Sequence, residues 1–188
     1  MTRKVAVIVG SLRKDSFNRK VARAIQAMAP PNLTMEIVEI GQLPLYNQDD
    51  DDQADPPQPW IEFRQRVKPF DAVLFVTPEY NRSIPGALKN ALDVGSRPYG
   101  SSVWGGKPGA VISASPGAIG GFGANHHLRQ TFVFLDIPCM QQPEAYLSGI
   151  SDEAFDAQGG FADERMRSFV QGFVDAYAGW VEAHSARA

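Results

Sequence analysis

The sequence predicts an α/β fold in which helices cover both faces of a parallel sheet. Short apolar runs alternate along the chain with longer segments whose apolar residues recur at helical spacing. The best of these runs contain no polar residue, as is typical of strands buried on both faces of a parallel sheet. Such alternation implies parallel strands joined by right-handed helical crossovers.

The predicted elements follow one another in strict strand–helix order. The first half has a strand at 5–9, a helix from Phe17 to the Pro30-Pro31 pair, a strand at 35–40 nearer an edge, a long acidic loop from Leu43 through Asp49–Asp52 to Pro57, and a helix at 60–67. The second half has a strand at 72–77, a helix with Pro85 in its first turn, a strand at 110–113, a helix marked by Leu128, Thr131, Phe132 and Leu135, and a short last strand at 138–140. A final helix follows, and its core stripe is Met166, Phe169, Val170, Phe173, Val174, Tyr177, Trp180 and Val181. Five strands in this pattern fit the order 2-1-3-4-5 of the flavodoxin-like three-layer sandwich.

Length and composition narrow the class of protein. A chain of 188 residues is expected to form a single domain, residues 1–188, with a full core. The net charge of −3 does not favour a nucleic-acid partner. No apolar run approaches the ~20 residues of a membrane span, and the N-terminus does not resemble a signal peptide, so a cytoplasmic location is expected. The single cysteine, Cys139, excludes an internal disulfide, so redox chemistry would require a cofactor.

The loop after the first strand, residues 10–18, has the composition of a phosphate site. It is rich in side-chain donors, with Ser11, Ser16 and Asn18, and Arg13 adds a permanent positive charge. A helix N-terminus follows, where free backbone N–H groups and the helix dipole favour an anion. The P-loop and G-x-G-x-x-G patterns are both absent. One short loop with one arginine suits a single terminal phosphate, which favours a mononucleotide such as FMN.

Two further unusual loops follow the strands predicted to be adjacent to the first. Residues 78–85 offer backbone groups at Glu79–Asn81 that can meet the edge of a flavin, and Tyr80 can pack on its face. The alternative is a simple turn in which Ser83 caps the next helix. Residues 115–123 include Gly117 and other glycines that allow close backbone approach. Because all three loops leave the carboxyl ends of neighbouring strands, they are predicted to form one ligand crevice.

Three segments, residues 10–18, 77–93 and 128–136, closely resemble the NADPH-dependent FMN reductases, and in particular their quinone and chromate reductase branch. The likeness extends from about Lys4 to Glu144. It implies non-covalent FMN, NADPH or NADH as hydride donor, and a small-molecule acceptor such as a quinone, chromate, an azo or nitro compound, or free flavin. The residues that would hold FMN are Ser11, Arg13, Ser16, Phe17 and Asn18 at the phosphate, Pro78, Glu79, Tyr80, Asn81 and Ser83 along the isoalloxazine, and Ser115 and Gly117 opposite. No side-chain acid or base is implied, because the flavin performs the chemistry.

The resemblance also implies a homodimer or homotetramer. The loop at 43–47 matches one that meets the partner subunit. In one tetramer pattern of the family a Tyr pairs with a Glu, and here the two positions are His126 and Glu144, so the Tyr is missing. Val94 replaces a common Trp and Arg82 a frequent Tyr. Arg82 and Arg97 are candidates to attract the phosphates of the nicotinamide cofactor or an anionic acceptor, although solvated surface arginines are the simpler interpretation.

Other functions have weaker sequence support. A flavodoxin-like electron carrier without a nucleotide site is the main alternative, but flavodoxins usually lack the loop arginine and are strongly acidic. A hydrolase would use Ser115, but the G-x-S-x-G pattern is incomplete. The acidic stretch 49–52 lacks the spacing of a calcium loop, and the neighbours His126 and His127 would point about 100° apart on a helix. Cys139 is expected to be a buried strand residue.

Overall fold

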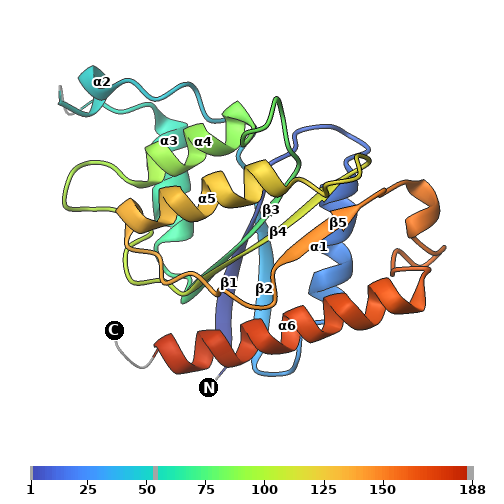
Figure 1. The fold of residues 1–188 in the computed structure, drawn as a ribbon. Helices are drawn as coiled ribbons and strands as arrows, with labels where there is room; N and C mark the ends of the chain where they lie inside the picture. Colours follow the sequence, from blue (N-terminus) through green and yellow to red (C-terminus); the bar gives the residue numbers. More distant parts are fainter. Residues whose placement is uncertain (1, 53–54, 186–188) are drawn as a thin grey trace.

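The computed structural model describes residues 2–52 and 55–185 and contains one five-stranded parallel sheet in the order β2-β1-β3-β4-β5 (Figure 1). The strands are β1 (Arg3–Val9), β2 (Leu33–Val38), β3 (Ala72–Thr77), β4 (Gly109–Ser115) and β5 (Ala145–Ser148). In the register, Val5 lies opposite Ala72, and Leu74 opposite Ala110. The predicted flavodoxin-like order is therefore confirmed.

Helices cover both faces of this sheet. One layer contains α1 (Phe17–Ala27) and α6 (Glu164–Ser185), and the other contains α3 (Gln58–Val67), α4 (Gly86–Gly95) and α5 (Phe122–Leu135). Each strand of the centre contributes to both cores: Val5 and Val7 pack under the first layer, whereas Ala6 and Ile8 pack under the second. Among the described residues, no helix is long and apolar enough to cross a membrane.

Three local details differ from the sequence prediction or add to it. The long acidic loop contains a short helix, α2 (Gln48–Asp52), before residues 53–54, which lie outside the described range. Pro85 precedes α4 as its N-cap instead of lying in its first turn, and Ser83 does not cap the helix. Helix α5, which the sequence marks at Leu128–Leu135 without giving a start, begins at Phe122, where Gly121 with φ of 80° turns the chain into the helix.

The last strand is also misplaced in the sequence prediction. The structure places β5 at Ala145–Ser148, whereas Cys139 forms only an isolated bridge with Gly109. Pro138 has no N–H to contribute to a ladder, which explains why pairing does not extend through this segment. Cys139 is therefore a half-buried bridge residue, not a buried strand residue.

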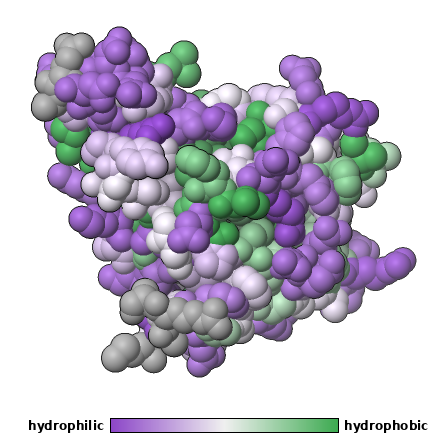
Figure 2. All heavy atoms as spheres, turned by 60° about the vertical axis from the view of Figure 1, so that its left-hand side comes forward, coloured by the Kyte–Doolittle hydropathy of each residue, from purple (hydrophilic) through white to green (hydrophobic). Residues whose placement is uncertain are grey.

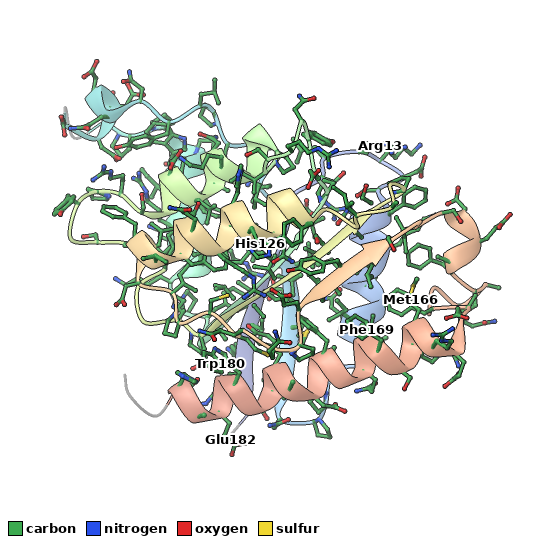
Figure 3. All side chains as sticks on the ribbon, in the orientation of Figure 1. Arg13, His126, Met166, Phe169, Trp180 and Glu182 are labelled. Atoms are coloured by element: carbon green, nitrogen blue, oxygen red, sulfur yellow. The ribbon has the colours of Figure 1, made fainter. Side chains whose placement is uncertain are left out.

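The final helix buries the centre of its predicted stripe. Val170, Phe173, Val174 and Tyr177 are buried against the sheet. Met166 and Trp180 are only half-buried, and Phe169 is exposed (Figure 3). Met166 and Trp180 pack against the edge of this core, so the ends of the stripe lie nearer the surface than its centre. A short 3₁₀ turn, Asp152–Ala154, connects β5 toward this helix.

Candidate functional site

The three unusual loops lie at one edge of the sheet, because β1, β3 and β4 are neighbours and all are parallel. Gly10 allows the first two loops to begin close together. A Cβ at Gly10 would lie 2.8 Å from Thr77 Oγ1 and 3.0 Å from a methyl of Leu88. Its N–H donates to Val76 O at 2.8 Å. The convergence predicted from the sequence is therefore present in the fold.

The first loop buries three polar side chains around the N-terminus of α1. Ser11, Ser16 and Asn18 are each at most 4% exposed. Ser16 is the N-cap, and its Oγ accepts from the backbone N–H of Arg19 at 3.2 Å. The N–H groups of Phe17 and Asn18, at the start of the helix, have no intrahelical acceptor. This end of α1 therefore offers free donors beside buried hydroxyls.

Asn18 has a buried polar atom without a partner in the part of the chain that the structure describes. Its Nδ2 donates to Ala114 O at 3.1 Å, which connects the first loop to the end of β4. Its Oδ1 is buried and has no hydrogen-bond partner among the described residues. A buried unpaired oxygen is costly, and it is satisfied when a ligand supplies an O–H or N–H. A phosphorylated polyol such as the ribityl phosphate of FMN matches this chemistry.

Arg13 provides the positive charge of this loop. Its side chain is exposed and extends outward from the segment between β1 and α1 (Figure 3). Phe17 is half-buried at the start of α1, and Lys20 Nζ lies 5.6 Å from the centre of its ring. Exposure leaves the Arg13 guanidinium available to a phosphate.

The second loop contains a tight two-residue turn. Tyr80 and Ser83 exchange two backbone hydrogen bonds, of 2.9 and 3.0 Å. Between them Asn81 and Arg82 have φ values of 51° and 66°, a left-handed conformation that matches a type I′ turn. The Tyr80 N–H is thus used within the turn, so of the three N–H groups predicted to meet a ligand, those of Glu79 and Asn81 remain.

This turn is anchored to α5. Glu79 Oε2 accepts from the N–H of Ala124 at 3.1 Å, and a Cβ at Gly123 would lie 2.8 Å from Arg82 O. Ser83 Oγ lies 2.8 Å from His127 Nδ1. Tyr80 and Asn81 point to solvent, whereas Pro78, Glu79 and Ser83 are half-buried. Sequence reasoning placed Gly123 in the third loop but missed its contact with the second loop, and it missed Ala124 and His127 as anchors of that loop. The signal available was the Gly121-Phe-Gly123 pattern, which permits close approach to the start of α5.

The third loop is also well defined. Ser115 Oγ accepts from the N–H of Gly117 at 3.1 Å, and Ser115 O accepts from Ile150 N at 3.2 Å. Gly120, with φ of 58°, lies against the backbone of Tyr146. Gly117 is exposed and Ser115 half-buried. This loop therefore presents a firm backbone surface at the end of β4.

The described contacts give a hydrolase no base for Ser115. His126 Nε2 lies 2.9 Å from the Tyr146 hydroxyl, His127 is bonded to Ser83, and His184 is bonded to Trp180 O. Each histidine is thus engaged away from Ser115, which removes the geometric support for a serine nucleophile.

The positions noted for the tetramer contact and for anion attraction have different surroundings. His126 and Glu144 lie 3.8 Å apart within one chain. Burial, helped by a hydrogen bond to Glu144, raises the pKa of Tyr146 to about 12, so this phenol stays neutral at physiological pH. Arg82 lies at the ligand edge, but Arg97 follows the far end of α4, about 15 Å away along that ten-residue helix.

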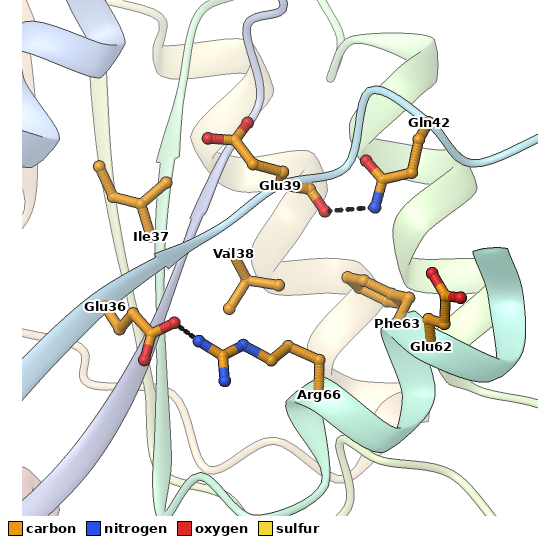
Figure 4. A pocket seen from close by; sticks show the side chains of 8 residues that line it. All are labelled: Glu36, Ile37, Val38, Glu39, Gln42, Glu62, Phe63 and Arg66. Atoms are coloured by element: carbon orange, nitrogen blue, oxygen red, sulfur yellow. Dashed lines mark hydrogen bonds and ion pairs between the residues drawn. The ribbon is translucent and has the colours of Figure 1, made fainter.

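A hollow of about 390 Å³ lies outside this edge, between β2 and α3 (Figure 4). Its charged side chains are largely paired: Glu36 forms an ion pair with Arg66, and Glu39 forms a bidentate pair with Arg19. The hydrogen bond from Arg19 lowers the pKa of Glu39. None of its lining residues belongs to the three loops, so we place the candidate site at the sheet edge and not in this hollow.

Comparison with known proteins agrees with this geometry. Residues 3–152 match the model of the NADPH-dependent FMN reductase family. A quinone reductase of Pseudomonas putida is 62% identical over 182 residues, covering 97% of this chain and 96% of the relative. A 2-hydroxy-1,4-benzoquinone reductase of a Burkholderia species is 51% identical over 181 residues, covering 96% of this chain and 97% of the relative.

A solved structure is similar over almost the whole chain. It is FerB, a flavoenzyme NAD(P)H:(acceptor) oxidoreductase from Paracoccus denitrificans, with 45% identity and a TM-score of 0.91, covering 97% of this chain and 99% of the other. Both the sequence match and the fold therefore assign this chain to the NADPH-dependent FMN reductase family.

Proposed function

We propose that this chain is an FMN-dependent NAD(P)H:quinone oxidoreductase. The observation that supports this most directly is the buried Oδ1 of Asn18, which no other described residue bonds and which lies in a loop with two buried hydroxyls at a helix N-terminus. The quinone reductase activity named for the relatives agrees with it. Chromate, azo compounds, nitro compounds and free flavin are further candidate acceptors, and either NADPH or NADH is a candidate donor.

The residues proposed to hold FMN divide among the three loops. The phosphate is assigned to Ser11, Arg13, Ser16, Phe17 and Asn18, the isoalloxazine to Pro78, Glu79, Tyr80, Asn81 and Ser83, and its opposite side to Ser115 and Gly117. Bound FMN would supply the hydride-transfer chemistry, and no side chain is assigned as a catalytic acid or base. The chain itself binds and orients: the start of α1 and Arg13 neutralise an anion, and the anchored Tyr80–Ser83 turn supports a flat ring.

We further propose that the protein is a homo-oligomer, at least a dimer. Four apolar side chains, Leu45, Tyr99, Val133 and Phe134, are between 82% and 86% exposed. Phe134 also lines a hollow of about 370 Å³ between α4 and α5. Figure 2 shows hydrophobic side chains gathered on this side of the molecule. Exposed apolar surface of this kind is typical of an interface.

A single domain spanning residues 1–188 and a cytoplasmic location complete the proposal.

The first test is the absorption spectrum of the purified protein. Flavin bands near roughly 375 and 450 nm that bleach when NADPH is added without oxygen, and return on addition of 1,4-benzoquinone, are expected because the cofactor performs the redox step. Bands that bleach only with dithionite would indicate an electron carrier without a nucleotide site. A colourless protein that does not take up added FMN would overturn the proposal.

A second test addresses the phosphate loop. The wild-type apoprotein is expected to bind FMN more tightly than riboflavin, which lacks the phosphate. Replacing Arg13 by Gln removes one charge-assisted contact and is expected to weaken FMN about tenfold, with little effect on riboflavin. Equal loss for both ligands would show that Arg13 does not act on the phosphate.

A further inference from the structure

Two adjacent histidines on α5 have contacts that the proposed function does not yet use. His126 and His127 project about 100° apart around the helix, and the structure gives them different partners. His126 Nε2 lies 2.9 Å from the Tyr146 hydroxyl, on β5, and its ring centre lies 4.2 Å from that of Phe122, with the two rings tilted by 36°. His127 Nδ1 instead lies 2.8 Å from Ser83 Oγ, at the end of the second loop. Only His127 therefore contacts a residue proposed to line the cofactor.

Ser83 holds a defined place because its backbone is fixed. Its N–H donates to Tyr80 O and its O accepts from Tyr80 N, which closes the turn over Asn81 and Arg82. The Ser83 hydroxyl takes no part in these backbone hydrogen bonds, so it can bond to a group outside the turn. The turn also rests on α5 through Glu79 and Ala124, two residues along the helix from the histidine pair. The hydrogen bond between Ser83 and His127 thus adds to the other contacts that hold this turn against α5.

The hydrogen bond to His127 determines what the Ser83 hydroxyl can offer to a ligand. A hydroxyl has one donor and two acceptor positions, and an imidazole nitrogen either accepts or donates according to its proton. When Nδ1 accepts, the Ser83 proton is committed to the ring and only lone pairs face a ligand. When Nδ1 carries a proton, the Ser83 O–H is free to donate. In both cases the ring restricts the rotation of the hydroxyl.

We propose that His127 is a positioning residue for the cofactor edge: by bonding to Ser83 Oγ, it sets the hydrogen bond that Ser83 presents to FMN bound against the Tyr80–Ser83 turn. This inference rests on the proposed function. It predicts that His127 influences the flavin only through Ser83. Two charged groups of the same loop, Glu79 and Arg82, form an ion pair at 3.5 Å; both are retained in the variants below.

The experiment measures the FMN dissociation constant of the apoprotein and the two-electron midpoint potential of the bound flavin. The variants are Ser83→Ala, His127→Leu, the double variant, and His127→Asn, whose amide oxygen can stand near the position of Nδ1. Ser83→Ala and His127→Leu are each expected to weaken FMN about three- to tenfold. The double variant is expected to match Ser83→Ala alone, and His127→Asn to recover most of the affinity and potential.

His126→Leu is the matched control, because it removes the neighbouring histidine without touching Ser83. It is expected to leave both the dissociation constant and the potential unchanged. Urea unfolding of each apoprotein identifies any variant that fails to fold. If His127→Leu fails to fold, the comparison of His127→Asn with His127→Gln replaces it. Gln places its amide one methylene further along the side chain than Asn, so His127→Gln is expected to lose the hydrogen bond to Ser83 and to weaken FMN binding.

Three outcomes would overturn the inference. The first is that His127→Leu keeps the wild-type FMN affinity and flavin midpoint potential; where His127→Gln is the fallback variant, the same result in His127→Gln counts. The second is a double variant whose losses multiply, which would show that His127 acts independently of Ser83. The third is a Ser83→Ala variant with no change. In all three the wild type still binds FMN, so the proposed function survives. A wild type that binds no FMN overturns both together.

Discussion

The side-chain amide of Asn18, at the start of α1, donates a hydrogen bond of 3.1 Å to the carbonyl oxygen of Ala114, near the end of β4. This contact connects the first candidate ligand loop to the end of the strand from which the third loop leaves. The other half of the same amide, Oδ1, is buried without a partner among the described residues. One side chain therefore both connects two segments at the site edge and offers a buried oxygen that can accept a hydrogen bond from a ligand.

The replacement Asn18→Ala is expected to separate these two roles. In the apoprotein it removes a hydrogen bond but also removes an unpaired buried oxygen, and these effects, each about 1 kcal/mol, oppose each other. The free energy of unfolding is therefore expected to change by less than about 1 kcal/mol, while FMN affinity falls about tenfold or more because both interactions are lost from the complex. Urea unfolding of the apoprotein and FMN titration check the two halves.

Asn125 is the matched control for this experiment. It is also buried, but its Nδ2 donates to Ser113 Oγ and Ala145 O, and its Oδ1 accepts from Arg129 Nε at 2.9 Å. Because this amide is fully paired, Asn125→Ala is expected to lower the stability of the apoprotein by about 2–3 kcal/mol. Equal stability losses for the two variants would contradict the special role of the Asn18 oxygen.

Gly123 is predicted to be intolerant of even a methyl group. A Cβ at this position would lie 2.8 Å from Arg82 O and 2.9 Å from Glu79 Oε2, so Gly123→Ala has to displace the second loop from α5. We expect a stability loss of about 1–3 kcal/mol, as for other overpacked sites, and a weaker, altered flavin spectrum.

The control is Gly179→Ala, in α6, where a Cβ would meet nothing within 4 Å. Helix propensity alone predicts that this change raises stability by up to about 1 kcal/mol. Thermal unfolding of both variants, with and without FMN, provides the comparison. A stable Gly123→Ala protein with an unchanged flavin spectrum would show that the second loop is not held in place by this close approach.

The proposed oligomer predicts that a charge at Phe134 disrupts association. Phe134→Glu places a carboxylate in an exposed apolar surface beside the α4–α5 hollow, where desolvating it is costly. Size-exclusion chromatography with light scattering is expected to show a smaller species than wild type. Phe169→Glu, on the exposed side of α6, serves as the control and should leave the mass unchanged. A monomeric wild type would contradict the proposed interface.

Strand order and loop convergence could be predicted from the sequence because they depend on strong local signals. The unbroken apolar strands β1 and β3 required cover on both faces, and parallel strands place their following loops at one edge. The weaker strand, β5, was misplaced because its alternation of buried Ala145 and Leu147 with outward residues is only four residues long.

Contacts between loops could not be predicted in the same way. The hydrogen bond that the Ala124 N–H donates to Glu79 and the one between Ser83 and His127 connect residues more than forty positions apart, and each depends on where α5 begins. That start is set by the positive φ of Gly121, a conformation that the sequence permits but does not require. The site residues were therefore identifiable by type, whereas their anchoring emerged only from the fold.

The thiol of Cys139 is expected to react slowly with disulfide reagents in the folded protein. Burial raises the pKa of the Cys139 thiol above its ordinary value, and the nearby Arg129 only partly opposes this effect. A raised pKa means that less reactive thiolate is present at neutral pH. Modification by a disulfide reagent should therefore be slower in the folded protein than in the same chain unfolded in urea, and its rate should rise over a higher pH range in the folded protein than in the unfolded chain. Rapid modification of the folded protein at pH 7, equal to that of the unfolded chain, would contradict the burial of this sulfur.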